Sequence, residues 1–435
     1  MPAAQAVYRR LVRADHDSGA EGVPQEAQQD IARNGLRQIV AAGLQSTGDQ
    51  VVNAKTVLPW LLASLGAPGS LIGLLVPIRE SGSMLPQAPI TPWVERHRLR
   101  KWIWVGGAAG QALATAAMAL VAATASGVAA GVGILLALAA FALSRSLTSL
   151  SSKDVLGRTV PKGQRGQING ITTVLSGAVA ITIGLGIRLL GGDDVASGVL
   201  AALLGAVVVV WVVALAVYAT IREPAGEPSA ATESGPGWAA WAWRLLRDDA
   251  TFRRFVTVRT LLLVSALSPP FVVALAATRG GVGLGSLGPF VVAQGLANLL
   301  GGRVSGRLAD RSSRQLMIGT ATAASAVIAA FLALLAVPGA RSSEWLYPVV
   351  YLVLALTHTG VRVARKTYIV DMAEGDRRTE YVAVANTTMG VLLLAVGAVS
   401  SALAGLGNEA ALGFLAVLGA LGVAVGRTLP EVSRR

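Results

Sequence analysis

Four charged residues interrupt the first two hydrophobic stretches of this 435-residue sequence. Asp49 and Lys55 lie within the apolar run 39–65, and Arg79 and Glu80 are neighbours within 76–87. A charge at the depth of a lipid bilayer costs several kcal/mol unless it is paired or faces a water-filled cavity. These residues therefore predict either buried ion pairs or the wall of a polar path through a membrane.

Both interpretations of the four charges stay open. In the first, Asp49 pairs with Arg79 and Lys55 pairs with Glu80, and the pairs only hold helices together. In the second, Asp49 or Glu80 faces a cavity and exchanges a proton, since burial favours the protonated acid and a nearby base opposes it. Lys55 and Arg79 are then also candidates to attract an anionic group on a substrate.

At helical spacing, further polar residues lie on the same face as some of these charges. At about 100° per residue, Gln45, Asp49, Asn53 and Thr56 share one face, whereas Lys55 lies about 120° from Asp49 and is expected to have other neighbours. The candidate set for translocation and proton coupling is Gln45, Asp49, Asn53, Lys55, Arg79, Glu80, Ser83 and Gln87. The second half of the chain is less polar, with Arg259, Gln294, Asn298, His358, Arg362 and Asn386 inside its apolar segments. The carboxylates of the path are thus expected in the first half.

The composition indicates a membrane protein that is all α-helical. Hydrophobic residues make up 53% of the chain, charged residues only 14%, and the mean hydropathy is +0.59. A bilayer core needs about 20 apolar residues per helix, and segments of that length recur. Twelve spans are predicted, at 38–62, 70–93, 102–124, 128–150, 167–190, 197–220, 254–277, 283–305, 315–337, 346–364, 380–404 and 409–427.

Positive charge is confined to one side of these spans. The connections after even-numbered spans contain 23 lysines and arginines, and those after odd-numbered spans contain three. Basic residues stay on the cytoplasmic side during insertion, so both termini are expected in the cytoplasm of a bacterium, below its inner membrane. The net charge of +13 is therefore explained by orientation in the lipid bilayer, and no nucleic-acid partner is expected.

The chain divides near its middle at a segment rich in Pro, Gly, Ser and Glu, 221–237. Two short motifs, RRLVRAD from Arg9 and WRLLRDD from Trp243, resemble each other and predict amphipathic helices on the inner surface. The expected parts are an N-terminal segment 1–36, a six-helix bundle 37–220, a linker 221–252, a second six-helix bundle 253–427 and a tail 428–435. Two facing six-helix halves are typical of transporters.

The loop after predicted span 8 contains a motif that resembles the signature of a known family. The stretch GRLADRSSR, at 306–314 after span 8, resembles the loop signature of the major facilitator superfamily: Gly, three residues, Asp-Arg, any residue, Gly, Arg, then Arg or Lys. The matching residues are Gly306, Asp310, Arg311 and Arg314, with Glu95 and Arg96 at the corresponding place in the first half. The resemblance implies twelve helices in two pseudo-symmetric bundles, with these six residues as a cytoplasmic gate.

The function that follows is secondary active transport of a small organic solute by alternating access. Proton coupling is expected, and export is expected over import. The alternatives are proton-coupled uptake of an organic anion or a sugar-like solute and, from another class, a non-transporting receptor or scaffold. No Walker sequence, no cysteine and only three scattered histidines are present, so we expect no enzyme activity, no catalytic residue, no cofactor and no metal site. A monomer is expected.

Overall fold

The described residues form helices joined by short turns. The structure is a computed structural model that describes residues 2–12, 23–87, 90, 93–94, 96–161, 164–190, 197–225, 238–278, 284–337, 339–372 and 377–432. No strand occurs in this part of the chain. The predicted all-α class is therefore confirmed.

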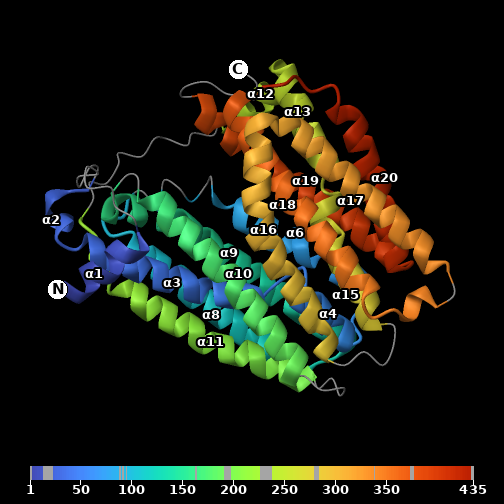
Figure 1. The fold of residues 1–435 in the computed structure, drawn as a ribbon, viewed down its shortest axis with the longest axis horizontal. Coiled ribbons are helices and arrows are strands. Elements are labelled where there is room, and N and C mark those ends of the chain that lie inside the picture. The colour runs from blue at the N-terminus through green and yellow to red at the C-terminus, as the bar shows by residue number, and fades with distance from the viewer. Residues whose placement is uncertain are drawn as a thin grey trace.

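The first half contains α1 (Pro2–Leu11), α2 (Gln25–Gln28), α3 (Ile31–Val51), α4 (Val57–Ser64), α5 (Gly69–Ile72), α6 (Leu75–Met84), α8 (Lys101–Thr124), α9 (Gly127–Thr159), α10 (Arg165–Leu190) and α11 (Ser197–Ala219). The second contains α12 (Trp238–Asp248), α13 (Ala250–Leu261), α14 (Val264–Leu267), α15 (Pro269–Thr278), η1 (Leu284–Leu287), α16 (Gly288–Arg311), α17 (Ser313–Leu335), η2 (Ala340–Ser342), α18 (Leu346–Met372), α19 (Arg377–Ala404) and α20 (Asn408–Gly426). Figure 1 shows the two halves side by side, with α4 and α6 of the first half lying against helices of the second half.

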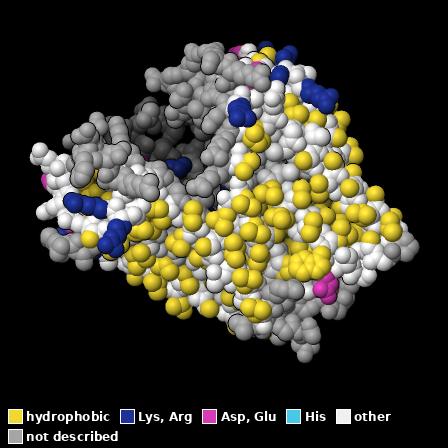
Figure 2. All heavy atoms as spheres, viewed as in Figure 1, with side chains coloured by type: hydrophobic (Ala, Val, Ile, Leu, Met, Phe, Trp, Pro, Cys, Tyr) yellow, Lys and Arg dark blue, Asp and Glu magenta, His cyan; other side chains and the backbone are white. Residues whose placement is uncertain are grey.

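Each predicted span has a helical counterpart. Eight of the described helical segments are long and apolar enough to cross a membrane, and the other four spans coincide with α3–α4, α5–α6, α10 and α16. Large apolar side chains such as Leu113, Leu136 and Leu189 are exposed on the outside of the bundle. Figure 2 shows the resulting hydrophobic band across both halves. Exposed apolar surface of this extent is expected where lipid is the solvent.

Three of the predicted spans are broken helices. Span 1 is interrupted at 52–56, span 2 at 73–74, and span 7 at 262–263 and again at Ser268, next to Pro269 and Pro270. Apolarity alone does not reveal such breaks, because it reports burial and not backbone geometry. Irregular backbone at membrane depth is tolerated where it is buried in protein or lines a cavity.

The two halves pack tightly at the end remote from the termini. One buried cluster joins α4, α15, α16 and α18, and includes Trp60, Phe271 and Phe290. Gly73 lies so close to α19 that a Cβ atom there would be 2.9 Å from the Cα of Ser401. Near the termini, by contrast, the buried clusters belong to one half each. The halves therefore diverge toward the termini, as Figure 1 shows, and Figure 2 shows a hollow on that side with basic side chains inside it.

Polar contacts hold the ends of the helices on the terminal side. The Glu223 carboxylate accepts hydrogen bonds from the backbone N–H groups of Arg100 and Lys101, at 3.2 and 2.8 Å, and so caps the first turn of α8. Burial raises the pKa of Glu223, although these hydrogen bonds and the charges of Arg158 and Arg100 oppose the shift. The Tyr8 hydroxyl of α1 donates to Gln164 at 2.8 Å, and burial raises its pKa to about 12.

Candidate functional site

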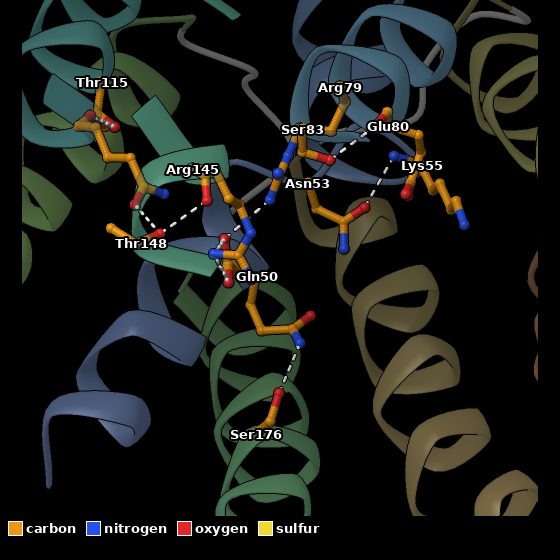
Figure 3. Close-up of polar contacts among 12 residues, drawn as sticks. Gln50, Asn53, Lys55, Arg79, Glu80, Ser83, Thr115, Arg145, Thr148 and Ser176 are labelled. Atoms are coloured by element: carbon orange, nitrogen blue, oxygen red, sulfur yellow. Dashed lines mark hydrogen bonds and ion pairs between the residues drawn. The ribbon is translucent and has the colours of Figure 1, made fainter. Parts of the chain in front are cut away.

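Asp49 is the centre of a three-residue ion-pair network in the first half. One guanidinium nitrogen of Arg79 lies 2.9 Å from its carboxylate, and Arg145 of α9 lies 2.6 Å from its other oxygen. The Arg79 guanidinium also covers the ring of Phe141 at 4.7 Å. Figure 3 shows the Arg145 and Arg79 side chains pointing toward one another from two helices. The Asp49–Arg79 pair of the ion-pair interpretation is thus present, with a second arginine added.

The break in span 1 directs Lys55 away from this network. Helix α3 ends at Val51, and the Asn53 carboxamide oxygen accepts a hydrogen bond from the backbone N–H of Lys55 at 2.8 Å. The Lys55 ammonium then reaches the other half of the molecule, where it lies 3.0 Å from Nε2 of His358 on α18. An ammonium group has only donors, so His358 must accept at Nε2 and carry its proton on Nδ1.

The Lys55–His358 hydrogen bond has a distinctive position. It is the one side-chain–side-chain hydrogen bond between the two halves among the described residues. The hydroxyl of Ser265 on α14 lies 3.5 Å from Nδ1 of the same histidine. Both breaks in the backbone, at 52–56 and beside α14, therefore present polar groups to one point on α18.

Glu80 faces several cations without an ion pair of 4.0 Å or less in the described structure. Lys55, Arg79, Arg365 and Arg362 are the charged groups that act on it. The predicted Lys55–Glu80 partnership is therefore electrostatic at most, and the hydrogen bond of Lys55 goes to His358 instead. The Ser83 hydroxyl donates to the backbone carbonyl of Glu80, and the Gln87 carboxamide donates to the backbone carbonyl of Ser83.

The predicted polar face of span 1 is only partly correct. Gln45 and Asp49 lie one turn apart on α3 and are partly exposed. The face does not continue to Asn53 and Thr56, because the helix ends before them, and Thr56 is buried with only 1% of its surface exposed. The helical spacing argument failed here because it assumed a regular helix across residues 52–56.

Three arginines of the second half complete the site, and one of them, Arg365, was not among the candidate residues of the sequence. Arg362 and Arg365 of α18 act on Glu80 and Lys55, and Arg259 of α13 donates to Asn386 of α19 at 3.1 Å. Arg365 had been counted as a loop charge, because predicted span 10 ends at residue 364. Arg145 of the first half lies within predicted span 4 but had been counted with the basic residues of the connection that follows it. Helices α9 and α18 in fact continue past those points. A run of small hydroxyl residues after Arg145, SLTSLSS, was the available signal.

The gate candidates of the loop motif are only partly described. Gly306 and Asp310 lie in α16, but their side chains are outside the described residues, and Glu95 is outside them altogether. Arg96 and Arg311 are exposed. Arg314 donates to the backbone carbonyl of Leu429 at 2.9 Å, a contact within the second half.

Other candidate binding features lie apart from this site. A cavity of about 390 Å³ is lined by Arg314, Gln315, Ile318, Gly319 and Arg427, at the terminal ends of α17 and α20. Among the described residues, no group of three His, Asp or Glu side chains could hold a metal ion.

Two six-helix halves around a polar centre define a membrane transporter. The chain belongs to the Major Facilitator Superfamily, since the family model of that description matches residues 40–353. A search of curated proteins finds no match.

Solved structures share this fold at low sequence identity. A D-xylose–proton symporter is 11% identical with a TM-score of 0.70, and the match covers 92% of this chain and 98% of that one. The nucleoside transporter NupG (D323A mutant) is 10% identical with a TM-score of 0.67, covering 91% and 99%. A peptide transporter POT in complex with sulfate is 13% identical with a TM-score of 0.68, covering 98% and 99%. Identities this low show the fold alone.

Proposed function

We propose that this chain carries a small organic anion together with protons across a bacterial inner membrane, by alternating access. One observation carries the proposal: the polar centre holds an excess of positive charge. Five basic side chains act on one or both of two carboxylates, Asp49 and Glu80, and a sixth, Arg259, lies near Arg365. The basic residues are Lys55, Arg79, Arg145, Arg259, Arg362 and Arg365. Buried cations without counter-ions are costly, and an anionic solute would supply the missing charge.

The two carboxylates have different roles in this proposal. Asp49 is compensated by two arginines within the first half, so it acts as a structural ion pair. Glu80 has several cations near it but no close ion pair in the described structure. A bound anion therefore competes with Glu80 for Lys55 and Arg362. Once the solute takes these cations, the ionised form of Glu80 loses its compensation and the protonated form is favoured. Anion and proton therefore bind together, which is the chemistry of a symporter.

This arrangement favours one of the two directions left open by the sequence. A symporter in a bacterial inner membrane uses the inward proton gradient for uptake, so import of an anion replaces export as the preferred hypothesis. The cytoplasmic location of both termini is part of the proposal and rests on the distribution of lysine and arginine. The hollow on the side of the termini is then the cytoplasm-facing exit.

The gate motif is part of the same cycle. We propose that Gly306, Asp310, Arg311 and Arg314, with Glu95 and Arg96 opposite, close the cytoplasmic side when the solute is bound from outside. The separate buried clusters of the two halves near the termini support an open gate in the present form.

Transport by the purified full-length chain in proteoliposomes tests the proposal. Uptake of radiolabelled anions, neutral sugars and organic cations is compared with the vesicle exterior at pH 5.5 and at pH 7.5, and vesicles without protein are the control. We expect uptake of anions only, accelerated by the acidic exterior, with alkalinisation of the external medium. Transport of a neutral or cationic solute alone, or anion uptake without proton movement, would contradict the proposal.

A further inference from the structure

Among the residues that the structure describes, Arg259 is a buried cation without an acidic partner. It lies on α13, only 6% of its surface is exposed, and its Nε–H has no hydrogen-bond partner. Its side chain donates instead to a neutral group, the carboxamide oxygen of Asn386 at 3.1 Å. A buried guanidinium is normally held by a carboxylate or a phosphate, frequently through two parallel hydrogen bonds.

The charged group next to Arg259 is another cation, so it does not supply the missing counter-ion. Arg365 of α18 is the charged group that acts on it, and Arg365 is itself a cation. Lys366 lies close enough for Arg259 to act on it as well. The three basic residues come from two helices, and their only described carboxylate neighbour is Glu80, which acts on Arg365.

This group is separate from the Lys55–His358 pair. His358 and Arg365 are seven residues apart on α18, which corresponds to about 10 Å along a helix. The first position, at Lys55 and His358, joins the two halves, whereas the second, at Arg259 and Arg365, belongs to the second half. Long basic side chains can approach each other across part of this separation, so one small solute can reach both.

We propose that Arg259, assisted by Arg365, binds a second acidic group of the solute, which makes the transported anion one with two acidic groups a few carbon atoms apart. This inference rests on the proposed function and extends it from anions in general to dianions. Asn386 is a positioning residue, because its carboxamide oxygen accepts a hydrogen bond from the Arg259 guanidinium and carries no charge that would satisfy the cation.

Replacement of the positioning amide by a carboxylate gives a sharp test. Asn386→Asp has nearly the same shape, and it places a permanent anion on Arg259. Arg259→Gln removes the cation. Arg254→Gln is the matched control, since Arg254 lies on the same helix and is exposed. Glutarate and its monomethyl ester are the probes, equal in length but different in charge, and their half-stabilising concentrations are measured by thermal unfolding of the purified full chain at pH 7.5.

The expected results separate this inference from the proposed function. Wild type and Arg254→Gln should bind glutarate about tenfold more tightly than the monoester. Asn386→Asp, which should fold at least as well as wild type, and Arg259→Gln should reduce that ratio to below about threefold. If wild type binds both probes with equal affinity, or if the preference survives Asn386→Asp, the inference is wrong and the proposed function stands. If neither probe nor any other anion stabilises wild type, the proposed function fails as well.

Discussion

The two halves of the molecule treat buried charge in opposite ways. In the first half, the Asp49 carboxylate holds Arg79 and Arg145 at 2.9 and 2.6 Å. In the second half, Arg259 has an amide as its partner, and the described neighbours of Arg362 and Arg365 are mostly other cations. Cations that are paired with a carboxylate hold helices in place, whereas cations without a counter-ion are stabilised when an anion binds. The difference supports a structural role for the Asp49 network and a solute-binding role for the second-half cations together with Lys55.

The strongest test of this comparison is the removal of the first-half carboxylate. Asp49→Asn leaves two guanidiniums without an acidic partner in the described structure, and loss of one partner of a buried ion pair costs about 3 kcal/mol. We expect a large fall in the thermal unfolding midpoint of the purified protein. Asp49→Asn combined with Arg145→Gln should recover part of the loss. An unchanged midpoint in the single variant would contradict a structural role for Asp49.

Removal of a second-half cation should lower the affinity for an anion and leave the stability of the protein nearly unchanged. Arg362→Gln takes away a charge that Lys55, Arg365 and His358 all face. We expect unfolding to change by less than about 1 kcal/mol, since no described ion pair is broken, and anion affinity to fall about tenfold. Affinity is measured by anion-dependent thermal stabilisation, with exposed Arg254→Gln as the control. Equal losses of stability in Arg362→Gln and Asp49→Asn would remove the distinction between the halves.

The Lys55–His358 contact between the halves should contribute less to stability than the Asp49 network does. Lys55→Met and His358→Phe each remove the 3.0 Å hydrogen bond. In a double-mutant cycle the two changes should couple by about 1 kcal/mol, the net value of a hydrogen bond to a charged or neutral partner. The four proteins are compared by their unfolding midpoints without ligand. Strict additivity would show that the Lys55–His358 contact contributes nothing to this form of the protein.

The smallest expected effect lies outside the membrane, at Glu223. Burial raises its folded-state pKa, so its contribution to stability is present at low pH and is lost as the pH rises through that folded value. The unfolding midpoint of wild type relative to Glu223→Gln should therefore fall between pH 4.5 and pH 7.5. The change should stay below the ~1 kcal/mol of an ordinary hydrogen bond, since two backbone N–H groups and nearby arginines favour the ionised form. A rise of the relative midpoint with pH would contradict this assignment.

Sequence reasoning recovered the fold better than the site. Apolar segment length and the placement of Lys and Arg define the spans because hydrocarbon thickness and membrane insertion act on those properties directly. The site depends on helix breaks and on contacts between distant segments, which those properties do not encode. Asp49 and Arg79 were paired correctly from chemistry alone. Lys55 was not, because its partner His358 is 303 residues away and is reached only through the break at 52–56.

The role of Arg365 was missed for a related reason. An arginine near the end of an apolar segment indicates which side of the membrane that end lies on, and most such arginines have no further role. Its proposed role becomes visible once α18 is seen to continue to Met372, with Arg362 and Arg365 close enough to act on Glu80. Charge balance within a three-dimensional site, and not the local sequence, identifies these cations.

The most direct test of the central claim is proton-driven anion accumulation by Glu80→Gln. Wild type, Glu80→Gln and the exposed control Glu344→Gln are reconstituted and loaded with an anion that wild type transports, and both gradient-driven uptake and anion exchange are measured. The account predicts that Glu80→Gln loses accumulation driven by an acidic exterior and still exchanges internal for external anion, whereas Glu344→Gln does both. Accumulation by Glu80→Gln at the wild-type level, with the wild-type proton movement, would contradict it.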